Sequence, residues 1–101
     1  MKKIVNGKLY STETAECVGS DQYSNPRDFH YWCETLYRKK NGEYFLHGEG
    51  NGLSHYRTYY SENSWGGGEE IIPMSIDEAK KWAETHLDAD EYIEEFGEPE
   101  E

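Results

Sequence analysis

Segment 29–49, FHYWCETLYRKKNGEYFLHGE, constrains the fold more than any other part of the chain. Two aromatic-rich runs flank an Asn-Gly dipeptide, the strongest short-range signal for a tight β-hairpin turn. Tyr, Phe, Trp and Thr suit a pleated, half-buried surface. We therefore expect one long β-hairpin here, with the remaining elements added to its faces and edges.

Two registers are open for this hairpin. A two-residue type I′ turn would place Tyr37 opposite Leu46. A three-residue loop with Gly42 in the left-handed conformation and a G1 bulge would place Tyr37 opposite Phe45 and Leu36 opposite Leu46. The second register pairs apolar residues across the strands and is the one we favour.

The remaining strand and loop signals come mainly from hydrophobic alternation and from Gly, Pro and Asn. Pro73 lacks a backbone N–H, so a strand that contains it should lie at a sheet edge or end there. The predicted strands are 3–5 and 8–10, joined at Asn6-Gly7, then 15–19, 55–60 and 69–74. The predicted loops are 21–28, 48–54 and 61–68.

Two helices are expected after these strands. Ser75 and Glu78 have the spacing of a capping box, and apolar residues recur at helical spacing over 75–87. A shorter helix, 89–96, should begin at Asp88, which repeats the box with Glu91, and end at Gly97.

Strands first and helices last indicate an α+β fold. We expect an antiparallel β-meander of about five strands with one or two C-terminal helices packed on one face. Residues 1–97 should form a single α+β domain and 98–101 a frayed acidic tail. Only 35% of the 101 residues are hydrophobic, but 15% are aromatic, and large rings can build a core from few positions.

The sequence favours a cytoplasmic protein. It contains no apolar run of about 18 residues for a membrane span and no hydrophobic signal-peptide core at the N-terminus. The only cysteines, Cys17 and Cys33, are expected to be reduced thiols, although a disulfide between them stays open.

Charge is distributed very unevenly along the chain. Residues 69–101 contain 13 acidic residues and two lysines, a net charge of −11, whereas residues 1–68 contain eight acids and eight bases. No Lys or Arg follows Lys81. Such a chain repels phosphate, so we expect no direct nucleic-acid binding.

The candidate partner-binding residues are six carboxylates of the second helix and its flanks. Spacings of three and four residues would bring several of them onto one helical face. One interpretation is an electrostatic surface for a basic protein partner; the other is a solvated face that keeps an aromatic-rich protein soluble. The residues are Asp88, Asp90, Glu91, Glu94, Glu95 and Glu98.

No catalytic, metal or cofactor signature is present, and we expect a protein that is not an enzyme. A weak catalytic alternative combines Glu34, His47 and Glu49 on the predicted hairpin. A second alternative is a small-molecule or peptide site on the aromatic sheet face. Its candidate residues are Tyr31, Trp32, Tyr37 and His47. The same sheet could also pair edge to edge into a homodimer.

Three segments carry a family resemblance: KIVNGKLYSTETA at the start, ETLYRKKNGEYFLHGEG in the hairpin, and IIPMSIDEAKKWAETHLDADEYIEEFGE near the end. The chain resembles small acidic, largely uncharacterised proteins encoded on phages and mobile elements of Gram-positive gut bacteria. The resemblance implies an inhibitor of a host nucleic-acid-binding defence protein, of the anti-CRISPR or antirestriction type. It assigns no functional residue.

Overall fold

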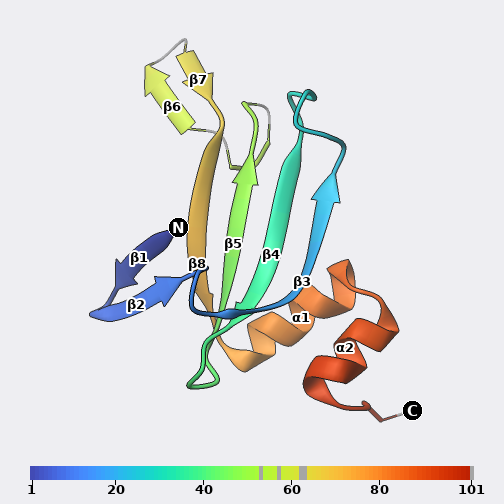
Figure 1. The fold of residues 1–101 in the computed structure, drawn as a ribbon. Coiled ribbons are helices and arrows are strands. Elements are labelled where there is room, and N and C mark those ends of the chain that lie inside the picture. The colour runs from blue at the N-terminus through green and yellow to red at the C-terminus, as the bar shows by residue number, and fades with distance from the viewer. Residues whose placement is uncertain (53, 57, 62–63, 101) are drawn as a thin grey trace.

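The computed structural model describes residues 1–52, 54–56, 58–61 and 64–100, with only the backbone of 58–61 and 64–65. Within these ranges, eight strands precede two helices (Figure 1). The strands are β1 (Lys2–Val5), β2 (Lys8–Ser11), β3 (Glu16–Tyr23), β4 (Trp32–Arg38), β5 (Tyr44–Gly50), β6 (Thr58–Ser61), β7 (Ser64–Gly66) and β8 (Gly68–Met74). The helices are α1 (Ile76–His86) and α2 (Ala89–Phe96).

The centre of the molecule is a four-stranded antiparallel sheet in the order β3-β4-β5-β8. Each strand lies beside the next one of the series, and the β6-β7 hairpin is inserted between β5 and β8. β1 and β2 form a separate hairpin. The α+β meander with two C-terminal helices is therefore confirmed, with four strands in the main sheet and the other four in hairpins beside it.

The β4-β5 turn adopts the favoured register. Tyr37 pairs with Phe45 and Leu36 with Leu46. Gly42 has a φ of 90°, a left-handed conformation that glycine adopts without the steric cost of a Cβ. The N–H of Lys39 donates to the carbonyl of Glu43 at 2.7 Å and closes the three-residue loop.

The Asn6-Gly7 turn has the other of the two geometries, the two-residue type I′ turn. Asn6 and Gly7 both have positive φ, 52° and 76°, and Val5 pairs with Lys8. This is the two-residue type I′ geometry, whose twist matches that of the flanking strands. The same dipeptide thus makes different loops at the two positions, because cross-strand pairing and not the dipeptide alone selects the register.

Several strand boundaries differ from those predicted from sequence. β3 continues through Tyr23, because residues 21–23 pair with β4 in spite of their weak strand preference. The sheet also extends β5 through Gly50. The ring of Tyr56 lies directly against Gly48, and a Cβ at this position would overlap that ring.

The segment between β5 and β8 contains more strand and less loop than expected. β6 begins at Thr58, three residues later than the predicted strand 55–60, and the predicted loop 61–68 contains β7 and the start of β8. Residues 53, 57, 62 and 63 of these predicted segments lie outside the described residues.

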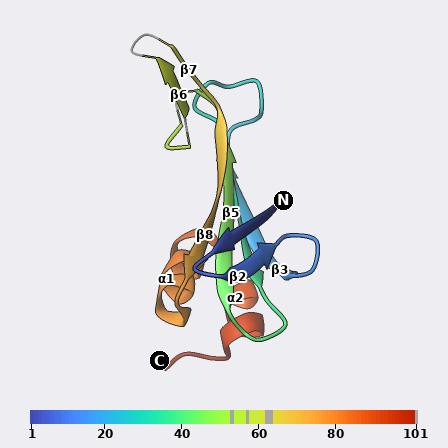
Figure 2. The same cartoon turned by 90° about the vertical axis from the view of Figure 1, so that its left-hand side faces the viewer.

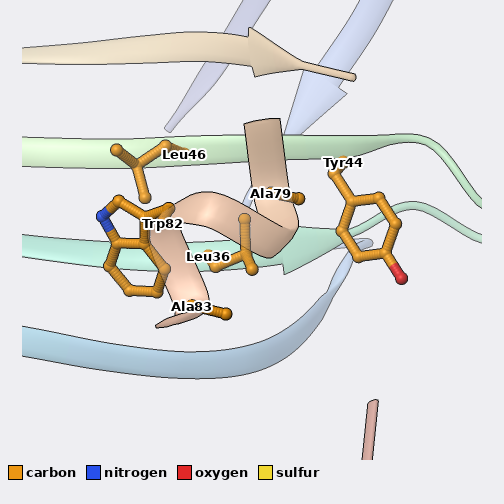
Figure 3. Close-up of a cluster of buried hydrophobic side chains, with 6 residues drawn as sticks. All are labelled: Leu36, Tyr44, Leu46, Ala79, Trp82 and Ala83. Atoms are coloured by element: carbon orange, nitrogen blue, oxygen red, sulfur yellow. The ribbon is translucent and has the colours of Figure 1, made fainter. Parts of the chain in front are cut away.

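Both faces of the sheet are covered. On one face, Leu36, Tyr44 and Leu46 pack against three residues of α1, namely Ala79, Trp82 and Ala83 (Figure 3). Neighbouring residues on the strands point the other way. On that second face Phe45 and Ile71 pack with Tyr10 of β2. Figure 2 shows the sheet nearly edge-on, with α1 on one side.

Both helices begin at the predicted capping boxes. Ser75 is the N-cap of α1 and exchanges hydrogen bonds with Glu78, and Asp88 and Glu91 do the same for α2. Gly97, with a φ of 84°, ends α2. Among the described residues, no helix combines the length and apolar character that a membrane span requires. Cys17 and Cys33 are free thiols.

Candidate functional site

The six predicted carboxylates do not share one environment. Asp88 and Glu91 bind each other's backbone at the start of α2: Asp88 Oδ1 accepts from the Glu91 N–H at 2.8 Å, and Glu91 Oε1 lies 3.5 Å from the Asp88 nitrogen. The Glu91 side chain also lies close to Gly19 of β3. These two residues therefore serve the local structure of the helix start.

Glu95 points toward the sheet. Its two carboxylate oxygens accept from Arg38 Nη1 at 2.8 and 2.6 Å, and Tyr44 Oη donates to the same group at 2.6 Å. The Glu95 side chain is only 11% exposed. Burial and the hydrogen bond to Glu95 raise the pKa of Tyr44 to about 12. Arg38 also pairs with Glu16, so this network ties α2 to β3, β4 and β5.

Four of the six carboxylates are exposed, including Asp88, which also caps α2. Asp90 and Glu94 are one helical turn apart on α2, and Glu94 also borders a pocket with Glu91 and Glu95. Glu98 lies beyond the end of the helix, so the predicted stripe does not continue along one helical face. We call these exposed residues the α2 acidic surface: Asp88, Asp90, Glu94 and Glu98.

The catalytic alternative does not assemble. Glu34 pairs with Gly48 across β4-β5 and lies on the helix-covered face, whereas His47 and Glu49 alternate onto the opposite face. His47 Nε2 instead lies 3.0 Å from Glu69 Oε2. The three groups therefore do not converge on one site.

Glu34 has other partners than His47 and Glu49, the residues with which the sequence grouped it. It is 7% exposed. Trp82 Nε1 donates to Oε1 at 3.0 Å, Tyr56 Oη donates to Oε2, and His55 Nε2 lies 3.3 Å from Oε2. Burial raises the pKa of Glu34, but the hydrogen bonds from Tyr56, Trp82 and His55 outweigh it and hold the pKa below its usual range.

His86, near the end of α1, completes this group. Its Nδ1 lies 2.9 Å from Asp21 Oδ2 and its Nε2 lies 3.8 Å from Glu34 Oε1. The imidazole stacks on Trp82 with ring centroids 4.8 Å apart. We call the whole group the Glu34 cluster: Asp21, Glu34, His55, Tyr56, Trp82 and His86.

The Glu34 cluster joins β3, β4, α1 and the turn before β6 through one ionised carboxylate. Its donors already satisfy both oxygens of Glu34, an arrangement suited to holding elements together. Within the described ranges, no group of three or more His, Cys, Asp or Glu side chains is arranged to hold a metal ion. Sequence carried one signal for this cluster: Glu34 alternates with Leu36 onto the face that packs under α1.

The aromatic alternative is also divided between faces. Trp32 shares the face of Glu34, and its ring meets the rings of His55 and His86 edge-on. Tyr37 lies on the other face and stacks on Phe45. Tyr31 is buried and lines a pocket of about 440 Å³ with Pro26, Glu49 and Gly67, among others.

Comparison of the chain with protein-family models, with curated proteins and with solved structures finds no match.

Proposed function

We propose that this is a non-enzymatic acidic binding protein that engages a basic protein partner through the α2 acidic surface. The observation that supports this proposal is that the six carboxylates fall into two groups, one in contact with the sheet and one exposed. Glu95 and Glu91 contact the sheet and fix the helix, whereas Asp90 and Glu94 are exposed, and no base lies on the same helix. Repulsion between like charges one turn apart costs a few tenths of a kcal/mol, which a partner's cations would offset.

A nucleic-acid-binding enzyme is the partner class that fits this surface best. Such enzymes carry a positively charged groove for phosphates, and a group of exposed carboxylates on a fixed helix can be attracted to the same groove. The resemblance to acidic mobile-element proteins supports an inhibitor of host defence, of the anti-CRISPR or antirestriction type, acting in the cytoplasm of the host cell. The chain itself would bind neither nucleic acid nor membrane, because its net charge of −11 repels both phosphate and anionic lipid.

The mode of recognition should be mainly electrostatic. Opposite charges steer association and accelerate it, and added salt weakens such attraction as the screening length shortens to about 8 Å at physiological ionic strength. The Arg38–Glu95 network would hold α2 in place before the partner arrives, so little ordering would be needed on binding.

Affinity isolation from a Gram-positive host lysate tests this function. The bait proteins are the wild type and an α2 variant carrying Asp90→Asn, Glu94→Gln and Glu98→Gln. These side chains make no hydrogen bond or ion pair with other described residues, so the substitutions remove charge and leave the fold intact. We expect the wild type to retain a basic nucleic-acid-binding enzyme at low salt and the α2 variant to lose it.

A control variant with the same change in net charge carries Glu13→Gln, Glu70→Gln and Asp77→Asn, at exposed positions away from α2. It should retain the partner as the wild type does. Equal retention by the α2 variant and the wild type would contradict the proposal and return the α2 acidic surface to a role in solubility.

A further inference from the structure

Lysines that are far apart in the sequence come together on the face of the sheet opposite the helices. The β1-β2 hairpin packs there through Tyr10, and its Lys8 reaches Glu43 of the β4-β5 turn at 3.2 Å. Lys8, Leu9 and Lys40 line one pocket of about 470 Å³ between the hairpin and that turn. The net charge of residues 1–68 is zero, so counting charges along the sequence does not reveal this basic region.

The same hairpin exposes apolar side chains beside its lysines. Ile4 and Leu9 are direct cross-strand partners and are 71% and 49% exposed. They point away from the sheet, because Tyr10 and Val5 occupy the side of the hairpin that packs on it. Lys2 shares this outward side with Ile4, and Lys40 lines the pocket beside Leu9. We call the combined region the hairpin basic surface: Lys2, Ile4, Leu9 and Lys40.

On the helix side, α1 and α2 form a groove of the opposite charge. The groove has a volume of about 280 Å³, and its walls include Leu87, Tyr92 and Ile93. Glu84 and Asp88 stand at the same groove and are both exposed. We call it the interhelix groove. It offers apolar walls with acidic neighbours, where the hairpin basic surface offers apolar side chains with basic neighbours.

We infer that the hairpin basic surface of one molecule binds the interhelix groove of a second copy of this chain. The two surfaces match in both properties: Ile4 and Leu9 are the apolar residues for the groove walls, and Lys2 and Lys40 are the cations for Glu84 and Asp88. An anionic bilayer presents negative charge over its whole surface to a molecule of net charge −11, whereas a second copy carries its acidic excess within residues 69–101, which include the groove.

The contact is head-to-tail. The hairpin packs on the sheet face of Phe45 and Ile71, and α1 and α2 pack on the face of Leu36 and Leu46, so the two surfaces of one molecule cannot meet each other. A heterologous contact of this kind leaves one free surface at each end, and addition of further copies produces rings or open chains. The contact between copies does not depend on the proposed external partner. Asp88 belongs both to the interhelix groove and to the α2 acidic surface, and the external partner would therefore compete with self-association.

Sedimentation velocity of the purified protein tests the inference with two blocked variants. A hairpin-blocked variant carries Lys2→Glu, Leu9→Glu and Lys40→Glu. A groove-blocked variant carries Glu84→Lys and Ala89→Lys, at two exposed groove positions. A control with the same charge change as the groove-blocked variant carries Ser20→Lys and Asp77→Lys, and circular dichroism verifies that each variant is folded.

The wild type should show a sedimentation coefficient that rises with protein concentration and falls as salt increases from about 50 to 300 mM. Each blocked variant should stay monomeric alone, and the control should associate as the wild type does. An equimolar mixture of the two blocked variants should form a dimer and nothing larger, because each contributes one working surface.

A wild type that stays monomeric up to about 1 mM would overturn the inference without reference to any variant. A mixture of folded blocked variants that stays monomeric would also overturn it. Binding of the monomeric wild type to vesicles that contain anionic lipid would assign the hairpin basic surface to a membrane instead. These sedimentation results do not depend on the external partner, because the experiment uses the purified protein alone. Failure of the affinity isolation would therefore not affect them.

Discussion

At the scale of single residues, Glu34 holds distant parts of the chain together. Tyr56 and Trp82 reach it from 22 and 48 residues further along the chain. A buried carboxylate is favourable only when its donors satisfy it, and removal of its charge leaves those donors poorly paired.

Glu34→Gln should therefore lower the free energy of unfolding by about 2–4 kcal/mol, because the amide keeps the shape but presents an NH₂ group to donors. Urea denaturation measures the change. Glu13→Gln, an exposed substitution of the same chemistry, should change the free energy by less than about 0.5 kcal/mol. Equal effects of the two substitutions would contradict the assigned role of Glu34.

The same residue predicts a dependence on pH. The pKa of Glu34 is lower in the folded protein than its usual value of about 4.3. Its ionised form therefore contributes stability that is fully present above about pH 4.3 and is lost as the pH falls through the lower, folded value. The difference in urea midpoint between the wild type and Glu34→Gln should shrink from pH 6 to pH 3. A difference that stays constant would show that the pKa is not lowered.

The side chains that contact Glu34 could not be predicted from the sequence. The sequence places Glu34 near His47 and Glu49, since the hairpin brings them into register. Side-chain alternation then separates them onto opposite faces. His86 and Tyr56 come close only through the packing of α1 and the turn at 54–56, which no local pattern encodes.

At the scale of elements, α2 depends on one network for its position. Its N-cap and C-cap were predictable from Asp88, Glu91 and Gly97, because capping is a local property. The sequence did not predict which carboxylates of α2 are exposed, because that depends on where Arg38 and Tyr44 contact the helix. The main hairpin was predictable for a similar reason: its register follows from neighbouring cross-strand pairs.

Glu95→Gln should release α2 from the sheet, because it removes the ion pair with Arg38 and weakens the acceptor for Tyr44. We expect a loss of about 1–3 kcal/mol, as for a hydrogen-bonded pair with a charged group. Hydrogen exchange should accelerate at the amides of α2 while those of β4 and β5 keep their protection.

Glu94→Gln, at the neighbouring but exposed residue, is the matched control and should leave exchange in α2 unchanged. Similar acceleration in both variants would mean that charge on α2, and not the contact with Arg38, governs the position of the helix.

At the scale of the whole molecule, folding arranges the charges more sharply than the sequence does. The acidic excess of residues 69–101 was evident by counting, but the opposing basic region was not, because Lys2 and Lys40 come from separate segments of the chain. The result is a sheet with acidic helices on one face and a basic hairpin on the other. Such a molecule can bind a cationic partner by one face without attraction from the other.

The most direct test of this account is the salt dependence of the dissociation constant for the partner that affinity isolation recovers. For the wild type we predict a steep loss of affinity between about 50 and 200 mM salt. The control variant should show the same slope of log affinity against log salt, and the variant with Asp90→Asn, Glu94→Gln and Glu98→Gln should show a shallower one. An affinity that does not change with salt, or equal slopes in all three proteins, would contradict binding through the α2 acidic surface.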